Sequence, residues 1–240
     1  MQYITARQLT QYFLSVSFIL IFVYLLVDYS VWNIWSIPIF FLALYVADVF
    51  TGFVHIYFDY RPCVSGVGLR ELFFYKGSKG SDEYIKMRRK TMTKISAFQE
   101  LTFDFKIHHP SPDTLGRRGF VKLTVGGIVF GGLPASLLLL LLAQLNLLNQ
   151  YFILFSLIFI AAMVISQYTH SCAHKKKIPY IPNILQKIRF FVSPERHDVH
   201  HQTLNRDFCI LNGWSNPLVN MIFDYCEKKS WVDMSGLEPD

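Results

Sequence analysis

Residues 31–58 read VWNIWSIPIFFLALYVADVFTGFVHIYF, an apolar run that is broken only by Asn33, Asp48 and His55. Three further runs are similarly apolar and occupy residues 12–27, 121–143 and 151–167. A helix rises 1.5 Å per residue, so about 20 apolar residues cross the roughly 30 Å hydrocarbon core of a bilayer. Runs of this length and hydropathy predict membrane spans rather than core helices of a soluble protein. With short extensions, the predicted spans are residues 10–28, 32–57, 121–143 and 148–169.

Short turns join these predicted spans in pairs. Residues 28–30 connect the first two spans and residues 144–150 connect the last two, so we expect an all-α membrane protein with two helical hairpins. Of the 23 Lys and Arg residues, one (Arg7) precedes the first span, thirteen lie in residues 61–122, and nine follow residue 174. Neither hairpin turn contains a basic residue.

The distribution of basic residues predicts the orientation. Basic residues stay on the cytoplasmic side of membrane proteins, so both termini are expected in the cytoplasm. There, residues 58–120 and 170–240 would form a histidine-rich cap on the spans. The whole chain, residues 1–240, would be one domain of a multi-pass protein in a bacterial inner membrane or the endoplasmic reticulum. The basic residues behind the net charge of +6 lie on this side of the membrane and are not gathered on one recognition helix, which argues against nucleic-acid binding.

The composition agrees with a membrane protein. Of the 240 residues, 52% are hydrophobic and 17% are charged, whereas soluble domains have about 25% charged residues. The four cysteines form no Cys-x-x-Cys pair, so we expect reduced thiols and no disulfide framework or zinc ribbon. They are Cys63, Cys172, Cys209 and Cys226.

The eight histidines form four clusters, each at a predicted cytoplasmic end of a span or in the cap. The clusters are His55, His108 with His109, His170 with His174, and His197 with His200 and His201. Spacings of three and four residues place side chains on one face of a helix. Imidazole is the commonest protein ligand of metals and suits iron, zinc, copper and nickel. Eight imidazoles that converge from distant parts of the chain predict a site for two metal ions.

Two aspartates share a helical stripe with His55. Asp48 lies seven residues before this histidine and Asp59 lies four residues after it. A carboxylate inside a membrane is costly and is therefore a functional candidate, so both aspartates join the predicted metal ligands. For Asp48, a structural hydrogen bond to a neighbouring helix is the alternative.

A short amphipathic helix is expected after Pro182. Ile184, Leu185, Ile188 and Phe191 would fall on one face of it. Such a pattern is typical of a helix that lies in the headgroup layer of a membrane.

The chemistry of the predicted site has two interpretations. A nitrogen-rich site without thiolates, placed beside apolar helices, suits iron that uses dioxygen to attack an unactivated C–H bond in a water-excluding site. Zinc is the rival metal, because two closed four-coordinate zinc sites could use all eight histidines without catalysis. A zinc-stabilised membrane protein or metal carrier is therefore the alternative of another class.

Four motifs resemble a known family. They are ADVFTGFVHIYFD at residues 47–59, FKIHHPSPDTLGRRGF at 105–120, HSCAHKKKIP at 170–179, and SPERHDVHHQTLNRDFCILNGWSN at 193–216. Their residues and order resemble the lipid desaturases that include plasmanylethanolamine desaturase, the bacterial CarF proteins, the Kua proteins and the plastid trans-3 acyl-phosphatidylglycerol desaturase. The resemblance extends over most of the chain between residues 47 and 216.

This resemblance implies a membrane di-iron desaturase that uses dioxygen and an external electron donor of the cytochrome b5 or ferredoxin type. Its substrate would be a membrane phospholipid, and in the plasmanyl branch a 1-O-alkyl chain becomes a vinyl ether. An acyl-chain desaturase or hydroxylase is the alternative among enzymes. The family's histidine motifs correspond to all eight histidines, and either Asp59 or Asp48 would be a ligand or would orient one. The eight histidines that correspond to the family's motifs are His55, His108, His109, His170, His174, His197, His200 and His201.

The chain departs from the family pattern outside the histidines. Ile56 follows the first histidine where the family has Trp, and residues 61–94 form a longer basic loop. Leu204 replaces a proline, and Asn205 and Arg206 stand where plasmanyl enzymes have His and Glu. We therefore expect differences in the segment that covers the site and in the contacts to the lipid headgroup.

Overall fold

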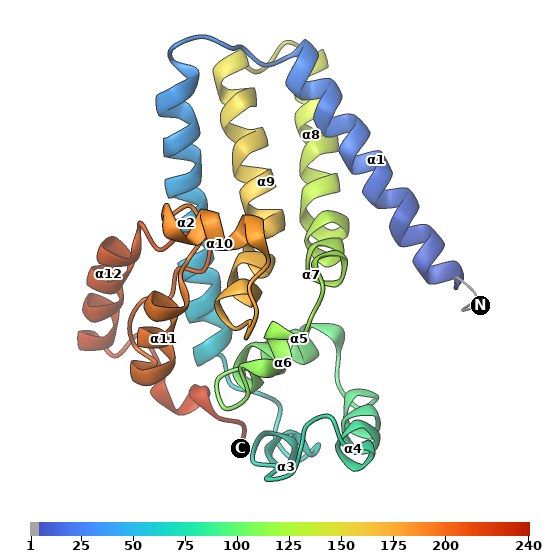
Figure 1. Ribbon diagram of the computed structural model, residues 1–240, viewed down its shortest axis with the longest axis vertical. Helices are drawn as coiled ribbons and strands as arrows, with labels where there is room; N and C mark the ends of the chain where they lie inside the picture. The colour runs from blue at the N-terminus through green and yellow to red at the C-terminus, as the bar shows by residue number, and fades with distance from the viewer. Residues whose placement is uncertain (1–4) are drawn as a thin grey trace.

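The structure, a computed structural model, describes residues 5–240; residues 1–4 and the side chain of Arg7 lie outside the described part. All regular elements of the described residues are helical. Four helical segments are long and apolar enough to cross a membrane, as predicted: Gln8–Asp28, Ser36–Tyr60, Phe120–Gln144 and Gln150–Ala173. They belong to helices α1 (Ala6–Asp28), α2 (Ser36–Tyr60), α7 (Phe120–Gly127) with α8 (Leu133–Gln144), and α9 (Gln150–Ala173). In Figure 1, α2, α9 and α8 run side by side, and α1 runs obliquely away from the upper end of α8.

Two span boundaries differ from the prediction in ways that matter for the site. Helix α2 begins at Ser36 because residues 31–35 form a turn, in which the Ser36 hydroxyl donates to the Val31 carbonyl and accepts from the Asn33 amide. It then continues to Tyr60, so that His55 and Asp59 lie on the same helix. Helix α9 likewise continues to Ala173 and carries His170 in its last turn.

The order of the spans differs from two simple hairpins. Helices α8 and α9 pack together as the second expected hairpin, but α1 packs against α8 and α9 rather than against α2. Helix α2 instead packs along α9, and the connection from α1 to α2 passes over the ends of the other spans in Figure 1. The first pair of spans is therefore not a packed hairpin. This arrangement puts the ends of α2 and α9 next to each other.

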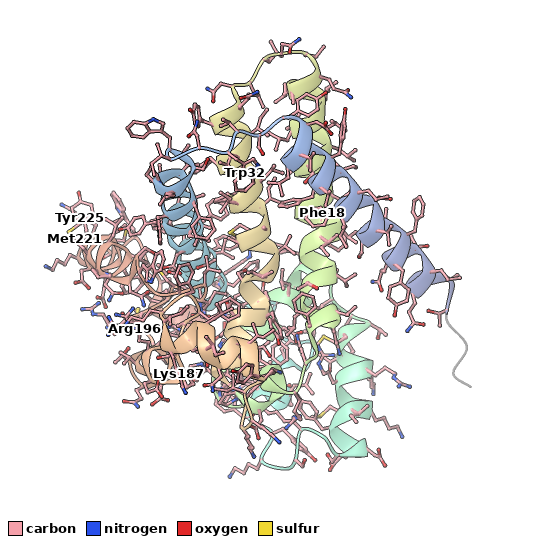
Figure 2. All side chains as sticks on the ribbon, turned by 45° about the horizontal axis from the view of Figure 1, so that its top comes forward. Phe18, Trp32, Lys187, Arg196, Met221 and Tyr225 are labelled. Atoms are coloured by element: carbon pink, nitrogen blue, oxygen red, sulfur yellow. The ribbon has the colours of Figure 1, made fainter. Side chains whose placement is uncertain are left out.

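The third span contains a π-helical turn, Ile128–Gly132, between α7 and α8. Pro134 follows this turn and lacks a backbone N–H, which explains the local departure from α-helical bonding. Gly132 allows close packing, because a Cβ there would lie 3.0 Å from both Phe18 and Val164. Figure 2 shows Phe18 on α1, pointing toward this part of the bundle.

The cap lies at one end of the spans, opposite the α1–α2 connection (Figure 1). It consists of α3 (Leu69–Phe73), α4 (Asp82–Met92), α5 (Ala97–Ile107), α6 (Asp113–Gly116), α10 (Tyr180–Lys187), α11 (Pro194–Thr203), α12 (Asn216–Lys228) and a final 3₁₀ turn, η2 (Met234–Leu237). Its own apolar core includes Leu69, Leu72, Phe103 and Ile107.

Two cap helices have exposed apolar faces beside the spans. On α12, Met221 and Tyr225 project outward in Figure 2. On α10, the exposed face is formed by Tyr180, Ile181, Ile184 and Ile188. This corrects the predicted face, since Leu185 and Phe191 are half-buried, and the helix begins at Tyr180, before Pro182 and not after it. An exposed apolar face on a short helix is typical of contact with a membrane surface.

Candidate metal centre

Four chain segments bring all eight histidines to one place between the spans and the cap. They come from the end of α2, the turn after α5, the end of α9, and α11. Their side chains form two neighbouring groups, each of which could hold a metal ion. The first, here called the five-histidine group, contains His108, His170, His174, His197 and His201. The second, here called the Asp59 group, contains His55, Asp59, His109 and His200.

Local sequence explains why these histidines occur at helix ends. Helix α5 begins with a capping box, in which the Ser96 hydroxyl accepts a bond from the Gln99 amide. It ends at Ile107, and Pro110 prevents its continuation, so His108 and His109 lie in the following turn. Helix α11 starts at Pro194, a residue favoured at the first helical position because the N–H it lacks would have no partner there.

In the five-histidine group, the potential ligand atoms all lie within 4.8 Å of one another. The Nε2 atoms of His170 and His197 are 2.8 Å apart, and those of His201 and His197 are 3.1 Å apart. Nitrogens that bind one metal ion at about 2.1 Å lie roughly 3.0–3.4 Å apart, depending on geometry. These separations therefore fit ligands of a common ion.

The Asp59 group has the same spacing around a carboxylate. The Nε2 atoms of His55 and His200 each lie 3.3 Å from Oδ2 of Asp59, and Nε2 of His109 lies 3.6 Å from Oδ1. The Nε2 atoms of His109 and His200 are 3.2 Å apart. Asp59, His55 and His200 are completely buried. One carboxylate and three imidazoles thus face a common point.

The two groups share adjacent residues. His108 belongs to the five-histidine group and His109 to the Asp59 group; likewise His201 belongs to the first and His200 to the second. The rings of His108 and His109 have centroids 4.4 Å apart. Each His-His pair therefore contributes one side chain to each group. Residue spacing alone did not predict this division of the histidines.

Several histidine rings are oriented by backbone carbonyls. The Nδ1 atom of His55 lies 2.9 Å from the carbonyl oxygen of Phe208, and Nδ1 of His200 lies 2.9 Å from that of Arg206. The ring of His108 is held similarly by the carbonyl of Phe105. A carbonyl can only accept, so Nδ1 carries the proton and Nε2 keeps its lone pair. Such partners are usual for metal-binding histidines.

Burial also favours the neutral form of the five histidines that lie outside the membrane spans and have lowered pKa values. Loss of hydration lowers the pKa of His109 and of His174 to about 4, and that of His201 to about 2. Burial, together with neighbouring imidazoles, also lowers the pKa of His108 and of His197. A neutral imidazole is the form that binds a metal ion.

The unpartnered atoms of the site fit metal ions. Buried side-chain atoms without a hydrogen-bond partner include Nε2 of His55, His108 and His174, and both carboxylate oxygens of Asp59. Buried polar atoms are almost always paired, so a cluster of acceptors without donors at one point fits the binding of a cation. The five-histidine group also offers more nitrogens than a closed four-coordinate zinc site uses. The five-histidine group therefore fits a metal with a larger coordination number, whereas the Asp59 group offers four ligating residues.

Asp48 does not belong to either group. Its Oδ1 accepts from the amides of Asn212 and Gly213, at 3.0 and 3.1 Å, and its Oδ2 accepts from the amide and hydroxyl of Ser215, at 3.0 and 2.7 Å. These bonds occupy both oxygens. The expectation that Asp48 binds metal is corrected accordingly: it holds the loop after α11 against the middle of α2.

Sequence reasoning missed the role of Lys106. This lysine is completely buried, and its ammonium donates to the backbone carbonyls of Asp59 and Gly236. It thereby ties the end of α2 to the C-terminal turn η2. The sequence contains one indication of this role. Lys106 lies three residues after Phe103, so both side chains fall on the same face of α5, and Phe103 is buried.

Two cavities open onto the site. One, of about 390 Å³, is lined by residues that include His109, His174, Glu195, Asp198 and His201. The other, of about 550 Å³, also reaches His109 and His201, and most of its remaining lining is apolar. Its apolar residues include Phe73, Phe74, Leu204, Met234 and Leu237. The two cavities therefore give a small molecule or a hydrocarbon chain access to the edge of both groups, at His109, His174 and His201.

Comparisons with known proteins agree with this site. The family model described as "Lipid desaturase domain" matches residues 82–234, which include seven of the eight histidines. The chain is 26% identical over 123 residues to the "Plasmanylethanolamine desaturase" of Myxococcus xanthus, an alignment that covers 49% of this chain and 42% of that relative. The chain thus matches less than half the length of this relative. No solved structure matches the chain. Because the family model covers more than half of the chain, this protein belongs to the lipid desaturase domain family.

Proposed function

We propose that this protein is a di-iron lipid desaturase that converts a plasmanyl (1-O-alkyl) phospholipid into a plasmenyl (vinyl ether) phospholipid. The observation that carries the proposal is the pair of adjacent, buried, nitrogen-rich groups at the ends of two membrane spans. Membership of the lipid desaturase domain family supports the reaction class. The named activity of the Myxococcus xanthus relative supports the ether-lipid substrate.

The five-histidine group and the Asp59 group would each hold one iron ion. Bound iron would supply the oxidising power of dioxygen toward an unactivated C–H bond. Overall, the CH₂–CH₂ unit loses two hydrogens, dioxygen is reduced to two waters, and an external donor supplies two electrons with two protons from solvent. A cytochrome b5 or ferredoxin would be the donor.

In this proposal the protein's own residues would orient the metal ligands, position the substrate and exclude water. The backbone carbonyls of Phe208 and Arg206 hold His55 and His200 in one orientation. The apolar cavity beside His109 and His201 would hold the hydrocarbon chain in a water-poor environment. Holding the reacting bond against a fixed oxidant would select which hydrogens are removed.

The proposed orientation places this site on the cytoplasmic side. No basic residue lies in the segments that connect α1 to α2 or α8 to α9. The exposed Trp32 and Trp35 lie in the α1–α2 connection, and tryptophans are enriched at membrane interfaces. An electron donor would then approach the cap from the cytoplasm.

Lipid mass spectrometry of cells with and without the protein tests the proposed function. The expected result is an acid-labile phospholipid two mass units lighter than its ether-linked precursor, formed only with dioxygen. A new double bond that is stable to acid would indicate an acyl substrate, and a gain of one oxygen would indicate hydroxylation. No change in any phospholipid would contradict a desaturase function.

A further inference from the structure

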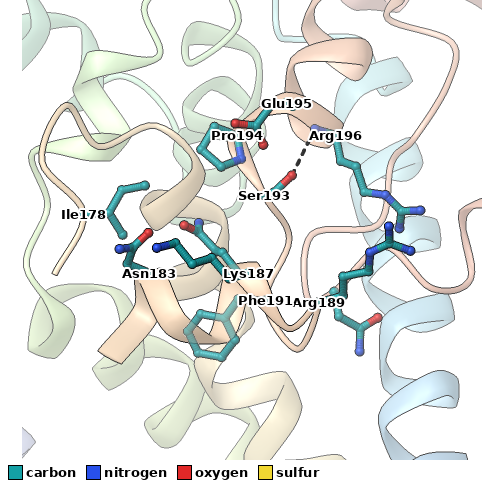
Figure 3. A pocket seen from close by; sticks show the side chains of 11 residues that line it. Ile178, Asn183, Lys187, Arg189, Phe191, Ser193, Pro194, Glu195 and Arg196 are labelled. Atoms are coloured by element: carbon teal, nitrogen blue, oxygen red, sulfur yellow. Dashed lines mark hydrogen bonds between the residues drawn. The ribbon is translucent and has the colours of Figure 1, made fainter. Parts of the chain in front are cut away.

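A third cavity lies beside the site, at the junction of α10 and α11. Its volume is about 430 Å³, and its lining contains three cationic side chains: Lys187, Arg189 and Arg196. Figure 3 shows the guanidinium groups of Arg189 and Arg196 on one side of this cavity and Lys187 on the other. Glu195 is the single carboxylate in the lining. The cavity therefore has an excess of positive charge.

These three cations lack acidic partners within the described residues. Within residues 5–240, none of the ion pairs with an N–O distance up to 4.0 Å includes Lys187, Arg189 or Arg196. Arg196 donates one bond to the Gly213 carbonyl, at 3.1 Å. Several unpaired cations around one cavity favour an anion, and a phosphate accepts hydrogen bonds from guanidinium groups especially well.

The backbone of Arg189 is strained. Its φ is 62°, in the left-handed region, at the C-terminal end of α10. Glycine or asparagine normally occupies this position after a helix. Keeping an arginine there costs free energy that glycine would avoid. A role for the Arg189 side chain would offset this cost.

The surroundings indicate that the anion belongs to a lipid. Asn183, Gln186 and Lys187 contribute the α10 side of the cavity. The other face of the same helix exposes Ile181, Ile184 and other apolar side chains. A helix with an apolar face of this kind lies at the level of lipid headgroups. The cavity is thus on the polar side of a membrane-surface helix, where phospholipid phosphates occur.

The cavity also lies next to the metal centre. It shares Pro194 and Glu195 with the 390 Å³ cavity that reaches His174 and His201. That cavity shares His109 and His201 with the larger apolar cavity. The three cavities therefore adjoin in a series that runs from positive charge, past the candidate metal ligands, to an apolar end.

We propose that the cavity formed by Lys187, Arg189 and Arg196 binds the phosphate of the phospholipid substrate. This inference rests on the proposed function. Only a few bonds separate the phosphate from the first carbons of a chain on the glycerol. A phosphate in this cavity therefore places those carbons beside His174 and His201, and the rest of the chain in the apolar cavity.

Binding of short-chain lipids to the purified full-length protein in detergent tests this proposal. The probes are dihexanoyl phosphatidylethanolamine, dihexanoylglycerol without phosphate, and inorganic phosphate. The test variant is Lys187→Gln with Arg189→Gly, in which glycine removes charge and strain together. Its matched control is Lys176→Gln with Lys177→Gln, which removes two charges from an exposed segment nearby.

We expect the Kd for the phospholipid to rise about tenfold or more in the test variant, because charge-assisted hydrogen bonds are lost. The control should stay within about twofold. Dihexanoylglycerol should bind both proteins equally and weakly. An unchanged Kd in the test variant would overturn the proposal. Inorganic phosphate that binds as tightly as the phospholipid would overturn its assignment to a lipid.

The same variant separates this inference from the proposed function. Where the wild-type protein desaturates the lipid, the test variant should have a higher KM and nearly the same kcat. The lost phosphate contacts would stabilise the ground state and the transition state equally. Binding without any desaturation would refute the proposed function alone. Desaturation with an unchanged KM would refute the phosphate site alone. The single variant Lys187→Gln gives a second test if the double variant folds poorly.

Discussion

His200 and His201 are neighbours on α11 but point to different metal groups. Nε2 of His200 lies 3.3 Å from Oδ2 of Asp59, whereas Nε2 of His201 lies 3.1 Å from Nε2 of His197. Consecutive residues on a helix differ by about 100° in direction. The His-His pair therefore reaches both groups from one helical turn.

Replacing these two histidines separately should affect the groups separately. We expect His200→Ala to lower metal occupancy of the Asp59 group and His201→Ala to lower that of the five-histidine group. Each variant should retain about one metal ion per chain and lose activity by about 100-fold or more, since even residues that only support ligands cost 10–100-fold. Elemental analysis with a lipid assay measures both effects.

Gln202→Ala is the matched control for both histidine variants. Gln202 is the next residue of α11 and is exposed, and its side chain bonds only to Asp198 among the described residues. It should leave metal content and activity unchanged. Complete loss of both metals in either histidine variant, with normal folding, would contradict the division into two groups.

Gly116, the last residue of α6, allows this short helix to approach the end of α9. A Cβ at this position would lie 2.4 Å from the carbonyl oxygen of His174. The substitution Gly116→Ala should therefore displace the backbone of His174 and lower metal binding and activity by about tenfold or more, as misplaced ligands do. Gly119→Ala is the control, because a Cβ there meets nothing within 4 Å. Equal effects of the two substitutions would contradict this explanation.

The two buried aspartates should respond differently to the same change. Asp48→Asn removes charge from a carboxylate that accepts four hydrogen bonds, so the metal-free protein should lose about 2 kcal/mol or more of stability. Asp59→Asn should leave the stability of the metal-free protein unchanged or higher, because the Asp59 carboxylate oxygens lack donors. It should instead weaken metal binding.

Thermal unfolding of the chelator-treated protein, with metal analysis of the untreated protein, separates the two aspartates. Destabilisation by Asp59→Asn, with Asp48→Asn neutral, would reverse the roles assigned to them.

Cysteine labelling tests the proposed orientation. Trp32→Cys and Lys229→Cys are made separately in a background with Cys63→Ser and Cys226→Ser; the remaining cysteines, Cys172 and Cys209, are completely buried. In intact cells, a membrane-impermeant maleimide should label Trp32→Cys only. After permeabilisation it should label Lys229→Cys as well. The opposite pattern would place the metal centre outside the cytoplasm.

Much of the fold follows from the sequence, because hydropathy and length define the spans directly. The packing order of the spans does not. Helix α1 packs against α8 and α9, which depends on small residues such as Gly132 facing Phe18. A short connection between two helices therefore does not ensure that they are neighbours.

The sequence predicts which residues are candidate ligands more accurately than it predicts how they are arranged in space. Asp48 and Asp59 are eleven residues apart on α2, about three helical turns, so a helical pattern places both on one stripe. They differ because the loop of residues 212–215 packs against Asp48, while the histidines gather at Asp59. Contacts between distant segments produce this difference, and the spacing of residues along one helix gives no information about such contacts.

Metal analysis of the purified protein tests the central claim most directly. Protein from iron-replete cells, measured by inductively coupled plasma mass spectrometry, should contain about two iron ions per chain and little zinc. The variant with both His200→Ala and His201→Ala should contain almost none. Two zinc ions per chain without iron, or no bound metal in the folded wild-type protein, would contradict a di-iron centre.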